Sequence, residues 1–295
     1  TWLRLSPHQP ASDRRAAPSK ATPVALAFRD DLGWLLQAAR LAPPGTTTTG
    51  PGPGLVEPRV PEAGATAEVV EALGNRGAQF LGELAAATRR LPAEIEEALW
   101  DGVARGLLTA DGFAAIRSLV NPGRTRPKSA HSVSRLRRGA PRPSRAAGRW
   151  SLIPPVEAVE DRESLAEAVA DQLLQRWGVV FRDLAVHEGM PLPWRDLQWA
   201  LRRFEDRGLV RGGRFVAGFS GEQYALPAAV EGLADIRRRP RSGERVTVNA
   251  CDPLNLTGVI IRGPRTPAVR TNTVTYVDGL PEGAAADGPA AAAAN

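Results

Sequence analysis

The spacing of apolar positions predicts three helices followed by a hairpin between residues 164 and 226. In the third helix, apolar side chains recur every three or four residues and therefore share one buried face. They are Leu197, Ala200, Leu201 and Phe204. Gly208 ends this helix, and a glycine-containing β-rich run follows it before a returning strand at 223–225. Helices at 164–177 and 179–187 precede it.

A second copy of this pattern lies upstream, at a spacing of 102 positions. The repeated positions are Ala98 and Ala200, Leu99 and Leu201, Arg105 and Arg207, Gly106 and Gly208, Leu107 and Leu209, and Phe113 and Phe215. The upstream copy has helices at 65–75, 80–89 and 92–105 and a wing at 107–119. Three helices and a hairpin form a winged-helix module, so the repeat predicts two such modules, at 65–120 and 148–240.

Outside the two modules, composition separates five further segments. We expect a loop at 1–23, a strand and a helix from an adjoining module at 24–41, a flexible linker at 42–64, a basic disordered linker at 121–147 and a disordered tail at 281–295. Residues 241–280 form a β-rich module with strands at 245–250, 256–261 and 272–277. Three strands barely close a core, so strands at 24–28 and 150–153 are candidates to complete a sheet or barrel. The fold class is α+β.

Composition favours a polyanionic partner and excludes several site types. The 295 residues carry a net charge of +6. One cysteine excludes an internal disulfide, and three scattered histidines show no zinc-binding spacing. A reducing cytoplasm, in association with the nucleoid, is the expected location, and no apolar run is long enough for a membrane partner. Because the chain begins with Thr1, we expect it to be part of a larger protein.

The two modules differ in charge. Between residues 65 and 120 there are eight acids and five bases. Four acids are expected on the exposed face of the third helix, where they would repel phosphates; they are Glu94, Glu96, Glu97 and Asp101. We therefore expect the first module to pack against a neighbour. Trp100 is expected in its core.

The second module concentrates arginine on its third helix and wing. Backbone contacts to DNA are expected from Arg195, Arg202, Arg211 and Arg214, with Trp199 stacking on a sugar or an unpaired base. The alternative is that these arginines form surface ion pairs with nearby acids, which contribute little to the stability of the fold. The sequence leaves both interpretations open. Residues 121–149 hold nine bases and no acid. Arg135, Arg137 and Arg138 would neutralise phosphates there, unless the segment is only a solvated insertion.

A search for catalytic motifs finds no phosphate-binding Gly-x-x-x-x-Gly-Lys-Ser/Thr loop and no serine nucleophile elbow. No catalytic residue is assigned. Asp252 and Asp278 are weak candidates for a water-positioning carboxylate, but both lie in turn sequences that favour aspartate structurally.

Several runs resemble the carboxy-terminal, DEAD/H-associated region of bacterial large helicase-related (Lhr) proteins. They are 98–101 (ALWD), 109–113 (TADGF), 148–152 (GRWSL), 214–227 (RFVAGFSGEQYALP), 252–256 (DPLNL) and 276–279 (YVDG). The resemblance implies an ATP-dependent 3'-5' DNA helicase that acts in DNA repair on single strands and hybrid duplexes. It also implies that ATP and Mg²⁺ are bound by motor domains of the parent, that no cofactor is bound in this chain, and that the partners are DNA and those motor domains.

The same region is similar to AlkZ-type DNA glycosylases, which are also built from winged helices and a barrel. That similarity offers base excision as an alternative function. The glycosylase motif Gln-x-Gln or Gln-x-Asp is missing, so the activity would require Asp278 or Asp252 in its place. A third alternative is a protein-binding array that forms homo-oligomers.

Overall fold

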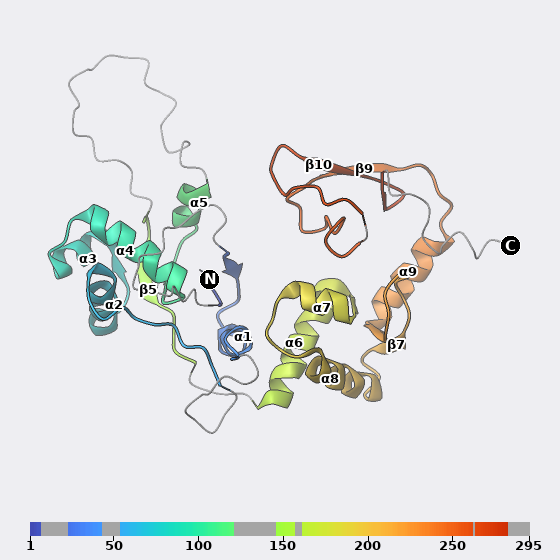
Figure 1. Ribbon diagram of the computed structural model, residues 1–295, viewed down its shortest axis with the longest axis horizontal. Coiled ribbons are helices and arrows are strands. Elements are labelled where there is room, and N and C mark those ends of the chain that lie inside the picture. Colours follow the sequence, from blue (N-terminus) through green and yellow to red (C-terminus); the bar gives the residue numbers. More distant parts are fainter. Residues whose placement is uncertain (7–22, 43–53, 121–145, 157–160, 262, 283–295) are drawn as a thin grey trace, which may run out of the picture. The chain divides into compact units, whose positions relative to one another are not determined.

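The computed structural model describes residues 1–6, 23–42, 54–120, 146–156, 161–261 and 263–282. These belong to two units, Thr1–Glu160 and Asp161–Asn295 (Figure 1). Both units mix helices with small antiparallel sheets.

Three helices and a three-stranded sheet form the body of the first unit. The helices are α2 (Ala65–Arg76), α3 (Leu81–Thr88) and α4 (Pro92–Arg105). The sheet has the order β3 (Gln79–Phe80), β5 (Arg149–Leu152), β4 (Leu108–Ala110). Pro92 occupies the first turn of α4, where its missing N–H is tolerated, and Gly106 ends the helix with φ of 76°. These elements lie in the range predicted for the first module, and the three helices lie where the periodicity predicts them.

The first residues of the chain were predicted to be a loop, and this is wrong for Trp2 and Leu3. They form β1 (Trp2–Leu3), which pairs with β2 (Ala25–Leu26). Trp2 is 1% exposed because its ring lies 6.2 Å from that of Trp100 and 6.0 Å from that of Trp150, between centroids. Trp100 is a core residue, as expected. The strand and helix expected at 24–41 are β2 and α1 (Leu32–Ala39).

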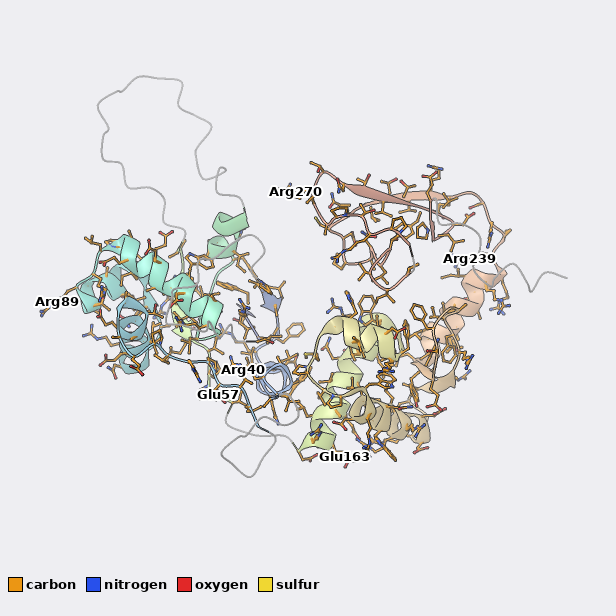
Figure 2. The ribbon with its side chains drawn as sticks, in the orientation of Figure 1. Arg40, Glu57, Arg89, Glu163, Arg239 and Arg270 are labelled. Atoms are coloured by element: carbon orange, nitrogen blue, oxygen red, sulfur yellow. The ribbon has the colours of Figure 1, made fainter. Side chains whose placement is uncertain are left out.

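Arg40, just after α1, fastens this segment to the first module. Its side chain is buried, and it donates hydrogen bonds to the carbonyl oxygens of Leu5 (3.2 Å) and Gly106 (3.0 Å). Burial lowers the pKa of the Arg40 guanidinium, and the charge of Glu57 opposes that shift. Both side chains are labelled in Figure 2. The amide of Val56 donates to the Arg40 carbonyl oxygen (2.7 Å). Part of the segment expected to be a flexible linker therefore returns to the body of the unit.

The wing of the first module also differs from the prediction. After β4 the chain forms α5 (Ala114–Val120), and the returning strand is β5, which was assigned to the second module. Thr109 of β4 pairs with Ser151 of β5. The fully buried Trp150 holds β5 in place, and the Asp111 carboxylate accepts the Arg149 amide (2.9 Å). Residues 121–145 are thus an insertion between β4 and β5. Arg135, Arg137 and Arg138 lie in it, outside the described residues.

The second unit repeats this order of elements. Its helices are α6 (Arg162–Trp177), α7 (Arg182–Glu188) and α8 (Trp194–Asp206). Its sheet has the order β6 (Val179–Val180), β8 (Gln223–Ala225), β7 (Arg211–Gly213), and α9 (Pro227–Arg238) follows. Asp161 caps α6 by accepting the amides of Glu163 (2.8 Å) and Ser164 (2.9 Å). Gly208, with φ of 75°, lies one residue beyond the C-cap of α8, whereas Gly106 is itself the C-cap of α4. These elements lie in the range predicted for the second module, except that β5 belongs to the sheet of the first unit.

The carboxy-terminal strands form an open sheet. Its order is β11 (Leu280–Pro281), β10 (Thr273–Val277), β9 (Arg245–Asn249). The strand predicted at 256–261 is absent, because the amides of Val259, Ile260 and Ile261 all turn back to the Leu256 carbonyl oxygen. The strands proposed to complete a barrel pair elsewhere, since β2 pairs with β1 and β5 with β3 and β4. No closed barrel exists among the described residues.

Candidate nucleic-acid interface

Helix α8 presents a basic and aromatic stripe to solvent. Arg195, Trp199 and Arg202 are spaced four and three residues apart, so they share the face opposite the buried Leu197 and Leu201. Trp199 is 54% exposed, which is unusual for so large an apolar side chain. The Arg202 guanidinium lies 6.0 Å from the centroid of the Trp199 ring. The stripe combines a flat aromatic face with flanking cations.

The loop between β7 and β8 is held down by the buried side chain of Gln223. Its amide oxygen accepts the backbone N–H groups of Phe215 (2.8 Å) and Val216 (2.7 Å), and its nitrogen donates to the Val216 carbonyl (2.8 Å). Phe219 packs on Phe181 with ring centroids 4.4 Å apart. The run 214–227, which carries the sequence resemblance, therefore folds onto the core and leaves charged side chains outside.

Glu205 joins α8 to the wing through the backbone. Its Oε1 accepts the amide N–H of Gly212 (2.9 Å). A Cβ at position 212 would lie 2.6 Å from that oxygen, so a larger residue there would push the Glu205 carboxylate away from the wing.

Glu222 makes the second connection, and it does so through side chains. Its Oε2 accepts hydrogen bonds from Gln198 Nε2 (3.1 Å), Arg202 Nη2 (3.1 Å) and the Tyr224 hydroxyl (2.8 Å). The Tyr224 hydroxyl, together with Gln198 and Arg202, lowers the pKa of the Glu222 carboxyl. Burial, reinforced by the hydrogen bond to Glu222, raises the pKa of Tyr224 to about 12. Glu222 is therefore ionised and Tyr224 is a hydroxyl at neutral pH.

The arginines of α8 and the wing separate into two groups. Arg203 and Arg207 bind acids of α6: Arg203 contacts Glu163 (2.8 Å) and Glu167 (2.7 Å), and Arg207 contacts Glu167 (2.8 Å). In contrast, three exposed arginines form no ion pair with any residue that the structure describes. They are Arg195, Arg211 and Arg214. Arg202 is intermediate, being half-exposed and paired with Glu222.

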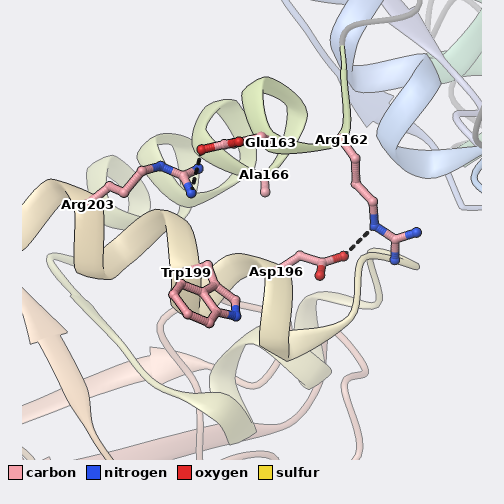
Figure 3. Close-up of a pocket in the computed structure, with 6 residues that line it drawn as sticks. All are labelled: Arg162, Glu163, Ala166, Asp196, Trp199 and Arg203. Atoms are coloured by element: carbon pink, nitrogen blue, oxygen red, sulfur yellow. Dashed lines mark hydrogen bonds and ion pairs between the residues drawn. The ribbon is translucent and has the colours of Figure 1, made fainter.

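Trp199 also borders an open groove of about 400 Å³ between α6 and α8 (Figure 3). The ion pairs Arg162–Asp196 (2.6 Å) and Arg203–Glu163 (2.8 Å) lie along it, and Ala166 lines it as well. Because these four charges neutralise each other, the groove itself has little attraction for phosphate. It offers the Trp199 ring a space in which a flat group could stack.

The acids predicted on α4 do not form one exposed face. Glu97 is exposed, and Glu94 and Glu96 are half-buried. Asp101 is 1% exposed, which contradicts the prediction. It accepts hydrogen bonds from Thr66 (2.8 Å) and Arg105 (2.9 Å), because α2 and α4 pack together at this point.

The two weak catalytic candidates both cap turns. Asp278 accepts the amides of Ser242 (3.2 Å), Gly243 (3.2 Å) and Glu244 (3.1 Å), and Asp252 accepts the amide of Leu254 (2.9 Å). These contacts give both aspartates a structural role. Within the described ranges there is no His, Cys, Asp and Glu cluster suited to a metal ion. None of the helices there has the length and apolarity that a membrane crossing requires.

Comparison with known proteins identifies the part of the chain that carries the stripe. Residues 159–245 match the family model described as large helicase-related protein, winged-helix domain. This part of the chain is an Lhr winged-helix domain. The resemblance to large helicase-related proteins is thereby confirmed, and α8 is the third helix of the Lhr winged-helix domain.

Two curated proteins are similar to most of the chain. The "Lhr helicase/uracil glycosylase" of Escherichia coli (strain K12) is 31% identical over 226 residues, which are 70% of this chain and 15% of the relative. The "Lhr helicase/ probable uracil glycosylase" of Mycolicibacterium smegmatis is 31% identical over 217 residues, 66% of this chain and 14% of the relative. The chain thus spans less than a sixth of either Lhr relative.

The sequence indicated the stripe of the Lhr winged-helix domain but missed Glu222 and Gln223. Both belong to the run that carries the family resemblance, so their presence was visible. Their roles were not, because the partners of Glu222 on α8 lie 20 and 24 positions away in the chain. Gln223 bonds only to backbone, which leaves no pattern of side chains to recognise.

Proposed function

We propose that this chain is a non-motor DNA-binding and assembly region of an Lhr-type ATP-dependent 3'-5' DNA helicase acting in DNA repair. The observation that carries the proposal is the exposure of Trp199 and of three arginines that have no ion pair with the described residues of the Lhr winged-helix domain; they are Arg195, Arg211 and Arg214. Exposed arginines without carboxylate partners are suited to phosphate oxygens, and an exposed indole is suited to a base. ATP and Mg²⁺ would be bound by the motor domains of the parent protein.

In this proposal the chain contains two winged-helix modules with different tasks. The matching helix order and sheet order of the two modules support a duplication. The second module holds the backbone of single-stranded DNA or a hybrid duplex. The first module, together with the segment around Trp2, serves assembly with the motor domains or with another copy of the chain. The inserted segment with Arg135, Arg137 and Arg138 adds sequence-independent contacts to phosphates.

The test measures DNA affinity against salt concentration for Arg211→Ala and Arg214→Ala. Each variant should weaken binding to single-stranded and duplex DNA and reduce the salt slope by about one unit, because one phosphate is no longer neutralised. Arg176→Ala is a matched control, because Arg176 is exposed and lies on α6 outside the stripe. If the Arg211→Ala and Arg214→Ala variants behave like Arg176→Ala in affinity and in slope, the proposal fails.

A second candidate function, base excision, is favoured by the names of both relatives, which include uracil glycosylase. The assay incubates the chain with uracil-containing DNA and measures abasic sites. Asp278→Asn and Asp252→Asn should each be tested, with thermal unfolding as a control because both aspartates cap turns. Activity that disappears in a folded Asp278→Asn variant would assign catalysis to that carboxylate. Absence of abasic sites with the unsubstituted chain would remove this candidate.

A third candidate function is an oligomerisation array, which is tested by the mass of the protein in solution and not by DNA binding. Light scattering would give a mass that is a multiple of the chain mass of 31.4 kDa, and DNA would not change it. A monomer that binds DNA would count against it.

A further inference from the structure

The Glu222 carboxylate occupies a position that resembles that of a bound anion. Three donors from two elements converge on the single oxygen Oε2: Gln198 and Arg202 from α8 and Tyr224 from β8. A guanidinium, an amide N–H and a hydroxyl are also donors that proteins use for phosphate oxygens. We propose that Gln198, Arg202 and Tyr224 form a phosphate-binding site for the nucleic-acid backbone, which Glu222 occupies until the phosphate displaces it. This inference rests on the proposed DNA-binding function of the stripe.

The exposure of the Arg202–Glu222 ion pair allows a phosphate to replace the Glu222 carboxylate. The side chains of Arg202 and Glu222 are 48% and 52% exposed, so neither has to leave a buried site for the pair to open. Ion pairs this exposed have little net stability in water, because the attraction is screened and two long side chains are ordered. A phosphate on a strand already held by Arg195 and Arg211 meets Arg202 at high effective concentration.

The wing does not depend on Glu222 for its shape. Gln223 fixes the loop through Phe215 and Val216, and Glu205 fixes β7 through the backbone of Gly212. A phosphate could replace Glu205 or Gln223 as acceptor only if the backbone of the wing lost the hydrogen bonds that hold it. Glu222 differs from both, because all three of its donors are side chains. A purely structural role for Glu222 would duplicate contacts that the wing already has.

The proposal predicts that Arg202→Ala has a small effect on DNA affinity in the unsubstituted chain and a large effect in the Glu222→Gln background. In the unsubstituted chain a phosphate reaches Arg202 only by displacing Glu222, and the lost ion pair offsets the gain, so Arg202→Ala should change DNA affinity by less than about twofold. In the Glu222→Gln background the guanidinium is available to phosphate. Glu222→Gln should therefore increase affinity by about threefold to tenfold and increase the salt slope by about one unit. Adding Arg202→Ala to Glu222→Gln should abolish that increase, which is a non-additive pair of substitutions.

The experiment uses the whole chain and a fluorescein-labelled oligothymidine, titrated at several salt concentrations. Glu205→Gln is the matched control: it removes a carboxylate that joins α8 to the wing but releases no arginine. Glu205→Gln should leave affinity unchanged or reduce it. If Glu222→Gln binds as weakly as Glu205→Gln, or binds like the unsubstituted chain, the carboxylate is not competing with phosphate and the proposal is overturned.

A measurement on the unsubstituted chain avoids dependence on the folding of Glu222→Gln. The Nε resonance of Arg202 is followed by NMR during addition of oligothymidine. It should shift at saturation as much as that of Arg211. An Arg202 signal that stays constant while that of Arg211 shifts would overturn this inference and keep the proposed function. Constant signals from both, with no effect of Arg211→Ala on affinity, would overturn both.

Discussion

The two predicted modules each have three helices and a three-stranded sheet of the same order, but the residues at corresponding positions of their third helix and wing differ in character. At the repeat spacing of 102 positions, every residue of the candidate interface has a counterpart in the first module. Arg195, Trp199, Arg202, Arg211 and Arg214 correspond to Ala93, Glu97, Trp100, Thr109 and Gly112. None of these counterparts is a base. The candidate interface therefore depends on the side chains at these positions and not on the arrangement of helices and strands alone.

In the first module the corresponding face is covered by the start of the chain. The Trp2 ring packs on Trp100, and its Nε1 donates to the Gly112 carbonyl oxygen (3.0 Å). The Trp2 carbonyl oxygen accepts the Thr109 hydroxyl. Three positions that carry arginine in the second module thus bind Trp2 in the first. The apolar Trp100 is buried by another segment of the chain, whereas the arginine at the corresponding position, Arg202, leaves that part of the surface exposed to solvent.

The largest expected effect is the difference in stability between the variants Trp2→Ala and Trp199→Ala. Trp2→Ala removes a ring that is 1% exposed and contacts two other indoles, so it should destabilise the first unit by about 3–5 kcal/mol. Trp199→Ala should change the stability of the second unit by less than about 0.5 kcal/mol, because the ring is exposed. Hydrogen exchange of α4 and α8 amides in the whole chain reports each unit separately. Equal losses would contradict the comparison.

The next effect concerns the repeated arginines Arg105 and Arg207. Arg105 is 4% exposed and pairs with Asp101, whereas Arg207 is 51% exposed and pairs with Glu167. Asp101→Ala leaves a buried cation without its carboxylate and should cost about 3–5 kcal/mol. Glu167→Gln should cost at most about 1 kcal/mol, since the pairs it breaks are partly exposed. Urea unfolding of each variant checks the difference, which would be absent if the two pairs were equivalent.

A smaller effect is expected on binding. Trp199→Ala should reduce affinity for single-stranded DNA by about 1–3 kcal/mol and affinity for a duplex by less, because a paired base cannot stack on the ring. Glu97→Ala, at the matching position of the first module, is the control and should leave both affinities unchanged. Equal losses for the two DNA forms would mean that Trp199 does not bind an unpaired base.

The smallest effect is on pH dependence. Arg203, and then Arg207, lowers the pKa of the Glu167 carboxyl below its ordinary value of 4.5. A carboxyl with a lower pKa in the folded state stabilises the fold above its unfolded pKa, and that stability disappears as the pH falls through the folded value. Between pH 7 and pH 3 the Tm of the second unit should therefore fall more in the unsubstituted chain than in Glu167→Gln. Parallel curves would show that these ion pairs add no pH-dependent stability.

Local patterns predicted most helices well but not the pairing of strands. The helix at 92–105 begins at a proline and ends before a glycine, so its bounds follow from short-range rules. Strand β5 pairs across the insertion at 121–145, and no short-range signal indicates its partner. Trp2 and Leu3 stand beside a polar, proline-rich segment that favours a loop, although both are buried. The exposed arginines of the stripe were predictable, because helical spacing places them opposite the apolar face.

Sequence alone determined the repeated helical pattern, the difference in charge between the modules and the Lhr resemblance, because each depends on residues close together or on direct repetition. Only the tertiary structure decided which arginines form ion pairs with carboxylates and which remain unpaired among the described residues. Arg203 and Arg207 are bound by α6, Arg202 is bound by Glu222, and Arg195, Arg211 and Arg214 have no ion pair with the described residues. Ion pairs depend on distances of a few ångströms between segments far apart in the chain, and folding alone sets those distances.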